Sequence, residues 1–359
     1  MSRPVHLAAH ALVSARGLSA SAAGAAIRAG ETTCVPRRLG ERTFPFFALP
    51  FAENDWLARA KSACAALRAE LPNLATDTPL FIASSSFQMG LFEKQGRPFN
   101  LPRTCASFAG QLADWLGLSG SHTCFSNACV SGFSALDAAS KLIAAGIIDD
   151  ALVLGVELAN ASTLAGFASM ELLSPDACRP FDRQRNGLVL GEALAAVHLT
   201  AQPSAWRIAG LSAGLDAYST TGPDPQGGPI AAAAVHCLKT AKTEPADIQL
   251  VKLQAAGSPG TDLAEANALY QVFGDALPTL ISLKPYLGHT LGASGIAELS
   301  ALLACLDADF VPATPGFSEI DPDIGLSPTQ SVEPRRIHRL LLNLIGFGGG
   351  LANLVVERA

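Results

Sequence analysis

Residues 127–132 read Asn-Ala-Cys-Val-Ser-Gly (NACVSG) and place one cysteine, Cys129, among small side chains. The next stretch, FSALDAASKLIAAG at 133–146, repeats apolar residues at helical spacing and ends on a glycine. A cysteine at a helix N-terminus meets the positive end of the helix dipole, which favours its thiolate. This stretch alone leaves two interpretations open, a nucleophile at Cys129 and a buried cysteine that only packs, and the second is the more common case.

Short apolar segments alternate with longer helical ones on both sides of this stretch. Apolar strands that lack a polar face are typical of sheets covered by helices on both sides, so the chain is expected to be α/β with mixed sheets. The end of the chain, 335–358, reads as two strands around a glycine turn, which predicts a hairpin. The expected strands are 79–86, 150–159 and 248–256, and the expected helices are 133–146 and 228–241.

The composition limits the class of protein. Hydrophobic residues make up 49% of the chain and charged residues only 16%, against about 25% charged residues in typical globular domains. Such an apolar surplus favours an extensive subunit interface. The net charge of -6 and the pI near 5.6 argue against a nucleic-acid partner. The eight cysteines form no CxxC pair, which favours reduced thiols in the cytoplasm.

The first 30 residues resemble a signal peptide only superficially. His6, His10, Ser14 and Arg16 interrupt any apolar core, so this segment is expected to form a strand, a turn and a helix. No run of about 18 apolar residues occurs elsewhere, and no membrane span is predicted.

The chain is expected to divide into two similar halves. Around 200–214 one strand candidate ends in Pro and Ser before another begins. We place the N-terminal half at 1–205, with the nucleophile cysteine, and the C-terminal half at 206–359, with the remaining glycine-rich motifs.

Four further stretches accompany the cysteine motif in a defined order. They are CRPFDRQRNGLVLGEALAAVHL (178–199), DAYSTTGPDPQGG (216–228), SLKPYLGHTLGASGIAELSALLACL (282–306) and NLIGFGGGLAN (343–353). Together the five motifs resemble those of the β-ketoacyl-acyl-carrier-protein synthases, condensing enzymes of the thiolase-like fold. The resemblance covers roughly residues 80–357 and implies a five-layered αβαβα architecture.

The resemblance also implies roles for individual residues. Cys129 would accept an acyl group from the phosphopantetheine thioester of an acyl carrier protein, and its N–H with that of Phe347 would form an oxyanion hole. His289 would hold the thioester carbonyl of a malonyl unit as it loses carbon dioxide. Lys284 and Glu192 would form a supporting ionic pair, and the Phe347 ring would act as a gate. Neither a metal nor a bound cofactor is implied.

Several of these residues also have purely structural interpretations. His289 at a helix start could cap backbone groups, Lys284 could be structural in a working enzyme, and Phe347 could belong to the core. Asp182 and Arg185 are interpreted as a fold-stabilising pair.

One motif departs from the family pattern. The family carries a second enolate-binding histidine in an AHGTGT loop, and the corresponding QAAGSPGTD at 254–262 has Ala256 at the histidine position. The loop is also shorter, and Pro259 is expected to stiffen it. After GFGG, Gly350 and Leu351 replace the polar pair usual in the family. A missing preorganised donor typically costs about 10²–10³ in rate.

These observations predict a ketosynthase-family subunit with impaired condensation of its own. We expect it to pair with a complete ketosynthase, as chain-length factors do, in fatty-acid, polyketide or aryl-polyene assembly. A dimer through strands near 122–128 is expected. Retention of Cys129 counts against this interpretation, because typical chain-length factors have replaced that cysteine. One alternative is an active condensing enzyme or priming acyltransferase that acts as a homodimer. Another is a hydrolase or transferase of coenzyme A esters.

Overall fold

Segments that are apolar on both faces form the strands of one large sheet. The structure is a computed structural model that describes residues 3–53, 55–96 and 101–359. Within those residues, ten strands are joined in the order β11-β10-β14-β15-β9-β1-β8-β6-β4-β5. They are β1 (Val5–Ser14), β4 (Leu80–Ala83), β5 (His122–Phe125), β6 (Asp150–Glu157), β8 (Ala193–Thr200), β9 (Trp206–Leu215), β10 (Leu250–Lys252), β11 (Thr279–Ile281), β14 (Arg339–Ile345) and β15 (Gly350–Arg358).

Helices cover both faces of this sheet, and two small sheets lie beside it. The helices are α1 (Ala20–Arg28), α2 (Trp56–Glu70), α3 (Met89–Gln95), α4 (Leu101–Leu116), α5 (Ser131–Ala144), α6 (Ala161–Ser169), α7 (Gly228–Thr240), α8 (Pro259–Phe273), α9 (Lys284–Leu287) and α10 (Ser294–Asp307), with 3-10 turns η1 (Pro245–Asp247), η2 (Leu291–Ala293) and η3 (Phe347–Gly349). The small sheets contain β2 (Val35–Leu39), β3 (Arg42–Phe47) and β7 (Leu190–Gly191), and β12 (Phe310–Val311) and β13 (Glu333–Pro334).

The ten strands are two copies of one five-stranded pattern. In β5-β4-β6-β8-β1 the first three strands are parallel to one another and the last two alternate in direction. The order β11-β10-β14-β15-β9 repeats this pattern. The copies meet where Val5–Leu7 of β1 pairs with residues 206–208 of β9. The expectation of two similar halves is therefore confirmed at the level of topology.

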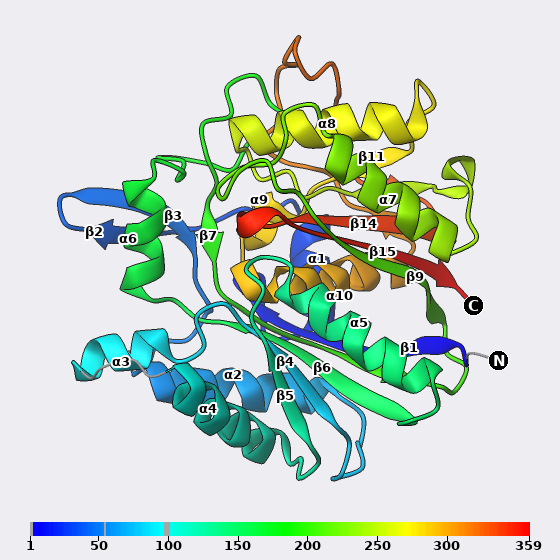
Figure 1. Cartoon of the computed structure of the whole chain (residues 1–359). Helices are drawn as coiled ribbons and strands as arrows, with labels where there is room; N and C mark the ends of the chain where they lie inside the picture. Colours follow the sequence, from blue (N-terminus) through cyan, green and yellow to red (C-terminus); the bar gives the residue numbers. More distant parts are fainter. Residues whose placement is uncertain (1–2, 54, 97–100) are drawn as a thin grey trace.

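The two sheet halves and their helices form five layers, as Figure 1 shows from bottom to top. Helices α2 and α4 cover the outer face of the N-terminal half, and α7 and α8 cover that of the C-terminal half. Helices α1, α5 and α10 lie between the two halves. Neighbouring residues of β6 point to opposite faces, so Leu152 joins the outer core and Val153 the central one. The αβαβα architecture is as expected.

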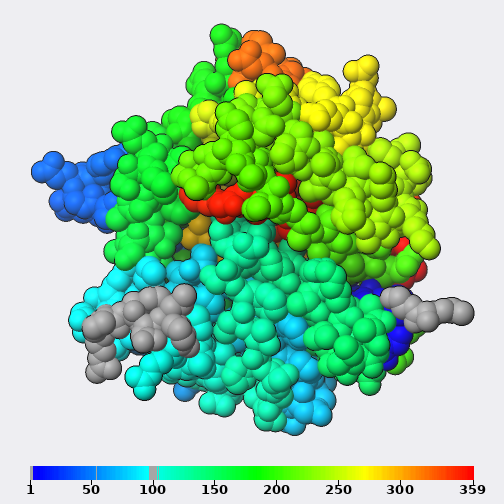
Figure 2. Space-filling view, in the orientation of Figure 1, coloured from blue at the N-terminus to red at the C-terminus, as the bar shows by residue number. Residues whose placement is uncertain are grey.

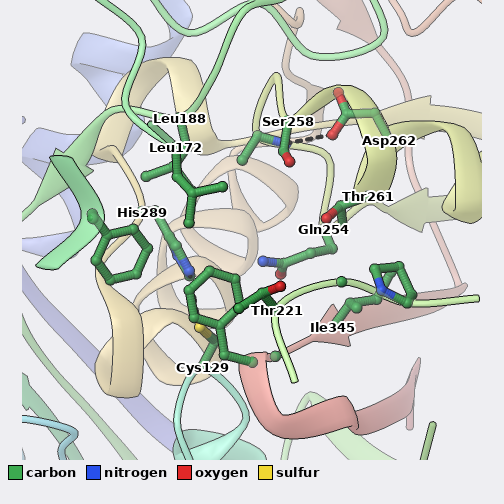
Figure 3. Close-up of a pocket in the computed structure, with 16 residues that line it drawn as sticks. Cys129, Leu172, Leu188, Thr221, Gln254, Ser258, Thr261, Asp262, His289 and Ile345 are labelled. Carbon is green, nitrogen blue, oxygen red and sulfur yellow. Dashed lines mark hydrogen bonds between the residues drawn. The ribbon is translucent and has the colours of Figure 1, made fainter. Parts of the chain in front are cut away.

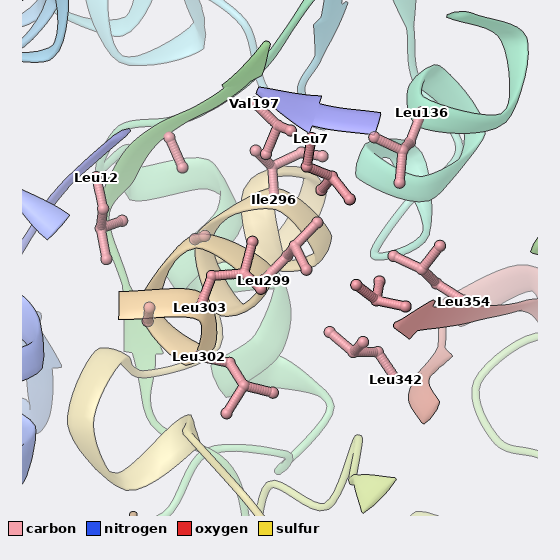
Figure 4. Packing of buried hydrophobic residues seen from close by; sticks show 14 of the residues in the cluster. Leu7, Leu12, Leu136, Val197, Ile296, Leu299, Leu302, Leu303, Leu342 and Leu354 are labelled. Carbon is pink, nitrogen blue, oxygen red and sulfur yellow. The ribbon is translucent and has the colours of Figure 1, made fainter. Parts of the chain in front are cut away.

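The central layer is the most thoroughly buried part of the protein. Helix α10 has no exposed face along most of its length, and Figure 4 shows Ile296, Leu299, Leu302 and Leu303 projecting from it toward both sheet halves. A helix that is apolar all round must be covered on every side. Its one acidic residue before the last turn, Glu298, is therefore placed inside the core.

Most expected elements are present with shifted ends. The hairpin, the helices after residues 132 and 227, and the N-terminal strand, turn and helix are confirmed. The prediction of a strand over 248–256 is wrong beyond Lys252, where β10 ends. The backbone N–H groups of residues 254–257 donate to carboxylates of α8 instead of a neighbouring strand. No helix among the described residues is long and apolar enough to cross a membrane.

Candidate active site

The turn before α5 holds Cys129 at the seam between the two halves. Ala128 adopts a left-handed backbone with φ 45°, a strained conformation that side-chain hydrogen bonds must support. The Ser131 hydroxyl supplies them, because it accepts from the Asn127 N–H at 2.7 Å and donates to the Ala128 carbonyl at 2.7 Å. The Cys129 side chain is thereby fixed with only 5% of its surface exposed.

His289 lies directly against this cysteine. Its Nε2 is 3.0 Å from Cys129 Sγ, and its Nδ1 is 3.0 Å from Ser294 Oγ. Its backbone N–H donates to the Val189 carbonyl at 2.7 Å, and Gly288, with φ 72°, turns the chain beside Leu190. Because the Ser294 hydroxyl can accept from Nδ1 or donate to it, both neutral tautomers of the imidazole are available.

Burial decides the resting protonation of this pair. It lowers the pKa of His289 well below its usual range, and Lys284 and Lys252 lower it further. Burial also raises the pKa of Cys129 to about 11, although an N–H bond from Phe347 and the charge of Lys284 act in the opposite direction. Burial therefore works against the thiolate that the helix dipole favours at Cys129, and it favours a neutral thiol beside a neutral imidazole.

Two backbone donors face the sulfur. The backbone N–H groups of Phe347 and Cys129 lie beside the sulfur and act to lower the pKa of the thiol, although burial outweighs them. The Phe347 turn is pressed against the loop that begins at Asp216, where a Cβ on Gly349 would lie 1.8 Å from the Asp216 carbonyl oxygen. Gly349 has φ 77°, so only glycine fits this turn without strain. The glycines therefore fix the Phe347 backbone N–H beside Cys129.

The ionic pair expected behind His289 has a different partner. Lys284 bonds Glu298, and Lys252 bonds the other oxygen of the same carboxylate at 2.6 Å. All three side chains are fully buried. Burial opposes ionisation of Glu298, but the two lysines outweigh it and lower its pKa. Lys284 also lies 3.5 Å from Ser294 Oγ, which links the cluster to His289.

Glu192 is held away from this cluster. It pairs with Arg59 through both carboxylate oxygens, at 3.0 and 2.7 Å, and accepts the N–H groups of Leu49 and Ala159. The neighbouring Gly191 packs against the end of α9, where a Cβ would lie 2.1 Å from a carbonyl oxygen. Successive residues of a strand point to opposite faces, so Glu192 must face away from Lys284. The prediction of a Lys284–Glu192 pair is wrong.

The Phe347 ring stacks on Phe167, with centroids 5.2 Å apart and planes at 14°. These two rings and Cys129 border two cavities. One also has Ala256 and His289 in its wall, and Figure 3 shows the polar side chains of Thr221, Gln254 and Thr261 there; we call it the polar chamber. The other, the apolar chamber, is lined by Thr163, Gly166 and Phe167 of α6, with Met170 and Leu291. Cys129 therefore lies between two chambers, and the first carries the larger share of polar wall.

The space-filling view shows how these chambers are reached. In Figure 2 the red C-terminal segment and the gold segment before α10 lie at the bottom of a hollow. Green segments of the C-terminal half lie above it, and the teal region around α5 lies below it. The site is thus open between the two halves.

Ala256 lies in the polar chamber together with Cys129 and His289. Two buried carboxylates of α8 hold its loop: Glu265 accepts the N–H groups of residues 254 and 255, and Asp262 accepts those of residues 256 and 257. Pro259 does not stiffen this loop, because it is the first residue of α8, where its missing N–H has no helical partner to lose. The methyl group at position 256 does face the site.

The remaining motif residues support the fold. Asp182 accepts the N–H groups of Ser318 and Glu319, while Arg185 bonds the Asp182 carbonyl and pairs with Asp321. The expected side-chain pair between Asp182 and Arg185 is therefore not formed.

Sequence reasoning missed Glu298, Ser294 and Gln254, although all three lie within the quoted motifs. One sequence signal pointed to Glu298, which is an isolated glutamate in an otherwise apolar helix. A charge buried in such a helix needs partners of opposite charge.

Family profiles match most of the chain. One described as "Beta-ketoacyl synthase, N-terminal domain" matches residues 67–205, and one described as "Beta-ketoacyl synthase, C-terminal domain" matches residues 206–318. The 3-oxoacyl-[acyl-carrier-protein] synthase 2 of Mycobacterium leprae is 33% identical over 62% of this chain, but the match spans 57% of that protein. The Synechocystis enzyme of the same name is 31% identical over 73% of this chain and 67% of its own length.

Solved structures match nearly the whole chain. A complex of the ketosynthase ApeO with its chain length factor ApeC from Xenorhabdus doucetiae aligns with a TM-score of 0.87 and 22% identity, over 99% of this chain and 98% of that one. The ishigamide ketosynthase/chain length factor aligns with a TM-score of 0.86 and 22% identity over the full length of both chains. At this identity the likeness establishes the fold.

Substitution of Glu298→Ala is expected to destabilise the protein by about 3–5 kcal/mol, because it leaves two buried lysines without a counter-ion. Urea unfolding at pH 7.5 measures the change. The matched control is Glu319→Ala, which removes an exposed pair with Arg183 and is expected to cost about 0–1 kcal/mol. Equal losses in the two variants would contradict a structural role for the buried cluster.

A second prediction concerns the carboxylates that hold residues 254–257. Burial raises the pKa of Glu265 from 4.5 to about 7 and that of Asp262 from 3.8 to about 6. The folded state therefore retains protons that the unfolded chain has released, and the free energy of unfolding should fall as pH rises from about 4.5 to 7. Glu265→Gln should flatten this decline in urea titrations between pH 5 and 8.

The exposed Glu41→Gln is the control for this titration and should leave the profile unchanged. A Glu265→Gln profile parallel to that of the wild type would show that Glu265 does not titrate in this range.

Proposed function

The chain belongs to the β-ketoacyl synthase family, and we propose that it accepts an acyl group on Cys129 from a carrier-protein thioester. It would do so as a subunit of a fatty-acid, polyketide or aryl-polyene assembly system, paired with a complete ketosynthase. The observation that supports acyl transfer is the 3.0 Å approach of His289 Nε2 to Cys129 Sγ, with two backbone N–H groups directed at the same sulfur.

The residues of the site account for each atom of the transfer. As Sγ attacks the thioester carbonyl, its proton passes to His289 Nε2, and the carbonyl oxygen becomes an oxyanion between the N–H groups of Cys129 and Phe347. Collapse of this intermediate breaks the bond to the phosphopantetheine sulfur. That sulfur takes the proton from Nε2 and leaves as a thiol. Neutral forms of Cys129 and His289 are the correct starting states for this sequence.

The apolar chamber suits the acyl chain. It is bordered by Cys129 together with Phe167, Met170 and Leu291. An alkyl or polyene chain bound there would remove apolar surface from water. The polar chamber would then receive the phosphopantetheine arm.

Condensation is expected to be impaired. The malonyl carbonyl must be held by donors while carbon dioxide leaves, and His289 is the one imidazole among the described residues that line the polar chamber. With a methyl group at position 256, the site lacks one donor of the family pattern, which corresponds to a loss of about 10²–10³ in rate.

Pairing with a second ketosynthase-type chain draws support from three features. Two similar structures are ketosynthases with a chain length factor. The composition is unusually apolar. Strand β5 ends the sheet, with His122 and Thr123 exposed, and an edge strand of this kind can pair with another chain.

A self-sufficient β-ketoacyl synthase or priming acyltransferase, acting as a homodimer, is the second candidate. Retention of Cys129 with its imidazole and oxyanion donors favours it, because a subunit that only shapes a partner's chamber needs none of them.

Incubation with hexanoyl-loaded acyl carrier protein should add one hexanoyl group to the protein, as seen by intact mass. Cys129→Ser should abolish the adduct, and His289→Ala should slow its formation by about 10²-fold, the usual effect of losing a general base. Cys124→Ser, in the neighbouring strand β5, is the matched control and should keep the adduct. An adduct that persists in Cys129→Ser would contradict the proposed nucleophile.

Co-expression with a ketosynthase that carries both histidines should give a stable 1:1 complex by size-exclusion chromatography with light scattering. The chain alone should condense malonyl thioesters slowly. A homodimer that condenses them unaided at the rate of a two-histidine enzyme would exclude the partner role.

A further inference from the structure

Gln254 lines the polar chamber with a carboxamide whose oxygen is unpaired among the described residues. The side chain is 4% exposed, and its Oε1 has no hydrogen-bond partner among the described residues. Its backbone, by contrast, is fixed, because the Gln254 N–H donates to Glu265 at 2.8 Å. Buried polar atoms in native proteins are nearly always paired, so an orphaned one in a cavity points to a group that a ligand supplies.

The loop geometry explains why this carboxamide reaches the site. The side chain at 254 and the methyl group at 256 belong to the same chamber wall. Both residues line the polar chamber, whereas the intervening Ala255 packs into the core beneath α7 and α8. Figure 3 shows the Gln254 side chain extending into the chamber toward the side where Cys129 and His289 lie.

We propose that the Gln254 carboxamide is the second hydrogen-bonding group for the substrate thioester, in the space left by the missing imidazole at position 256. Its Nε2–H donates to the thioester carbonyl oxygen together with His289, and its Oε1 accepts from an N–H of the pantetheine arm. This inference rests on the proposed function, since it names the residue that meets the thioester at the same site.

The role can be written as a balanced step. The C–C bond to the carboxylate of a malonyl thioester breaks, carbon dioxide leaves, and the electron pair forms an enolate whose oxygen is held by His289 and Gln254. Without an acyl group on Cys129, the enolate carbon takes a proton from water and gives the acetyl thioester. An uncharged amide is a poorer donor to an enolate than a charged group, which agrees with slow rather than absent condensation.

The experiment separates this step from acyl transfer. The full-length protein, with its partner where one co-purifies, is incubated with malonyl-pantetheine, and the acetyl-pantetheine formed is quantified. Gln254→Leu keeps the side-chain size and removes both polar atoms, so decarboxylation should fall by about 10²-fold. Acylation of Cys129 by hexanoyl-loaded carrier protein should change by less than about threefold, because its oxyanion hole is elsewhere. Gln202→Leu, at an exposed glutamine, should change neither rate.

A rescue variant distinguishes a substrate contact from a structural role. Adding Ala256→His to Gln254→Leu should restore decarboxylation, because an imidazole returns to the same face of the loop. Wild-type decarboxylation in Gln254→Leu, or none in the unsubstituted protein, would overturn the assignment of Gln254. Absence of an acyl group on Cys129 would instead overturn the proposed function, whatever Gln254 does.

Discussion

The Glu298 carboxylate, ionised between Lys252 and Lys284 in the centre of the protein, is the interaction on which the site depends. The three residues come from α10, β10 and α9, so their attraction ties the central helix to the C-terminal sheet half. Because the first turn of α10 carries Ser294, the same cluster sets the position of the hydroxyl that holds His289. A charge cluster this deeply buried is costly to form and more costly to break. The position of His289 beside Cys129 Sγ is thereby coupled to the stability of the core.

The loop at 254–257 has kept its architecture without its imidazole. Asp262 and Glu265 still accept four consecutive backbone N–H groups, and Ser282 still donates to the Ala255 carbonyl. A loop with no remaining role would not require two buried carboxylates to hold it. The wall of the polar chamber therefore keeps its position, although position 256 carries a methyl group and offers no side-chain hydrogen bond.

Cys129 lies between two chambers that differ in the polarity of their walls, and this difference is consistent with the chemistry of the proposed thioester substrate. An acyl chain favours the apolar side near α6, and the amide-containing arm favours the polar side near Thr221 and Gln254. The stacked rings of Phe167 and Phe347 lie at the boundary. Burial that keeps the thiol neutral also strengthens every hydrogen bond to an oxyanion formed there.

The sequence by itself determined the α/β layering, because periodicity is a local property. The duplicated thiolase-like halves and the absence of a histidine at position 256 came from the resemblance of five ordered motifs to a known family. It also identified Cys129, His289 and Lys284 as residues to bring together. Only the tertiary structure decided which carboxylate pairs with Lys284. Gly191 packs against α9, so the next residue, Glu192, faces Arg59, and Glu298 of α10 pairs with Lys284 instead. The tertiary structure also showed how burial opposes ionisation of Cys129 and leaves Gln254 Oε1 without a partner among the described residues. Both depend on burial by segments far apart in the chain, which no local pattern encodes.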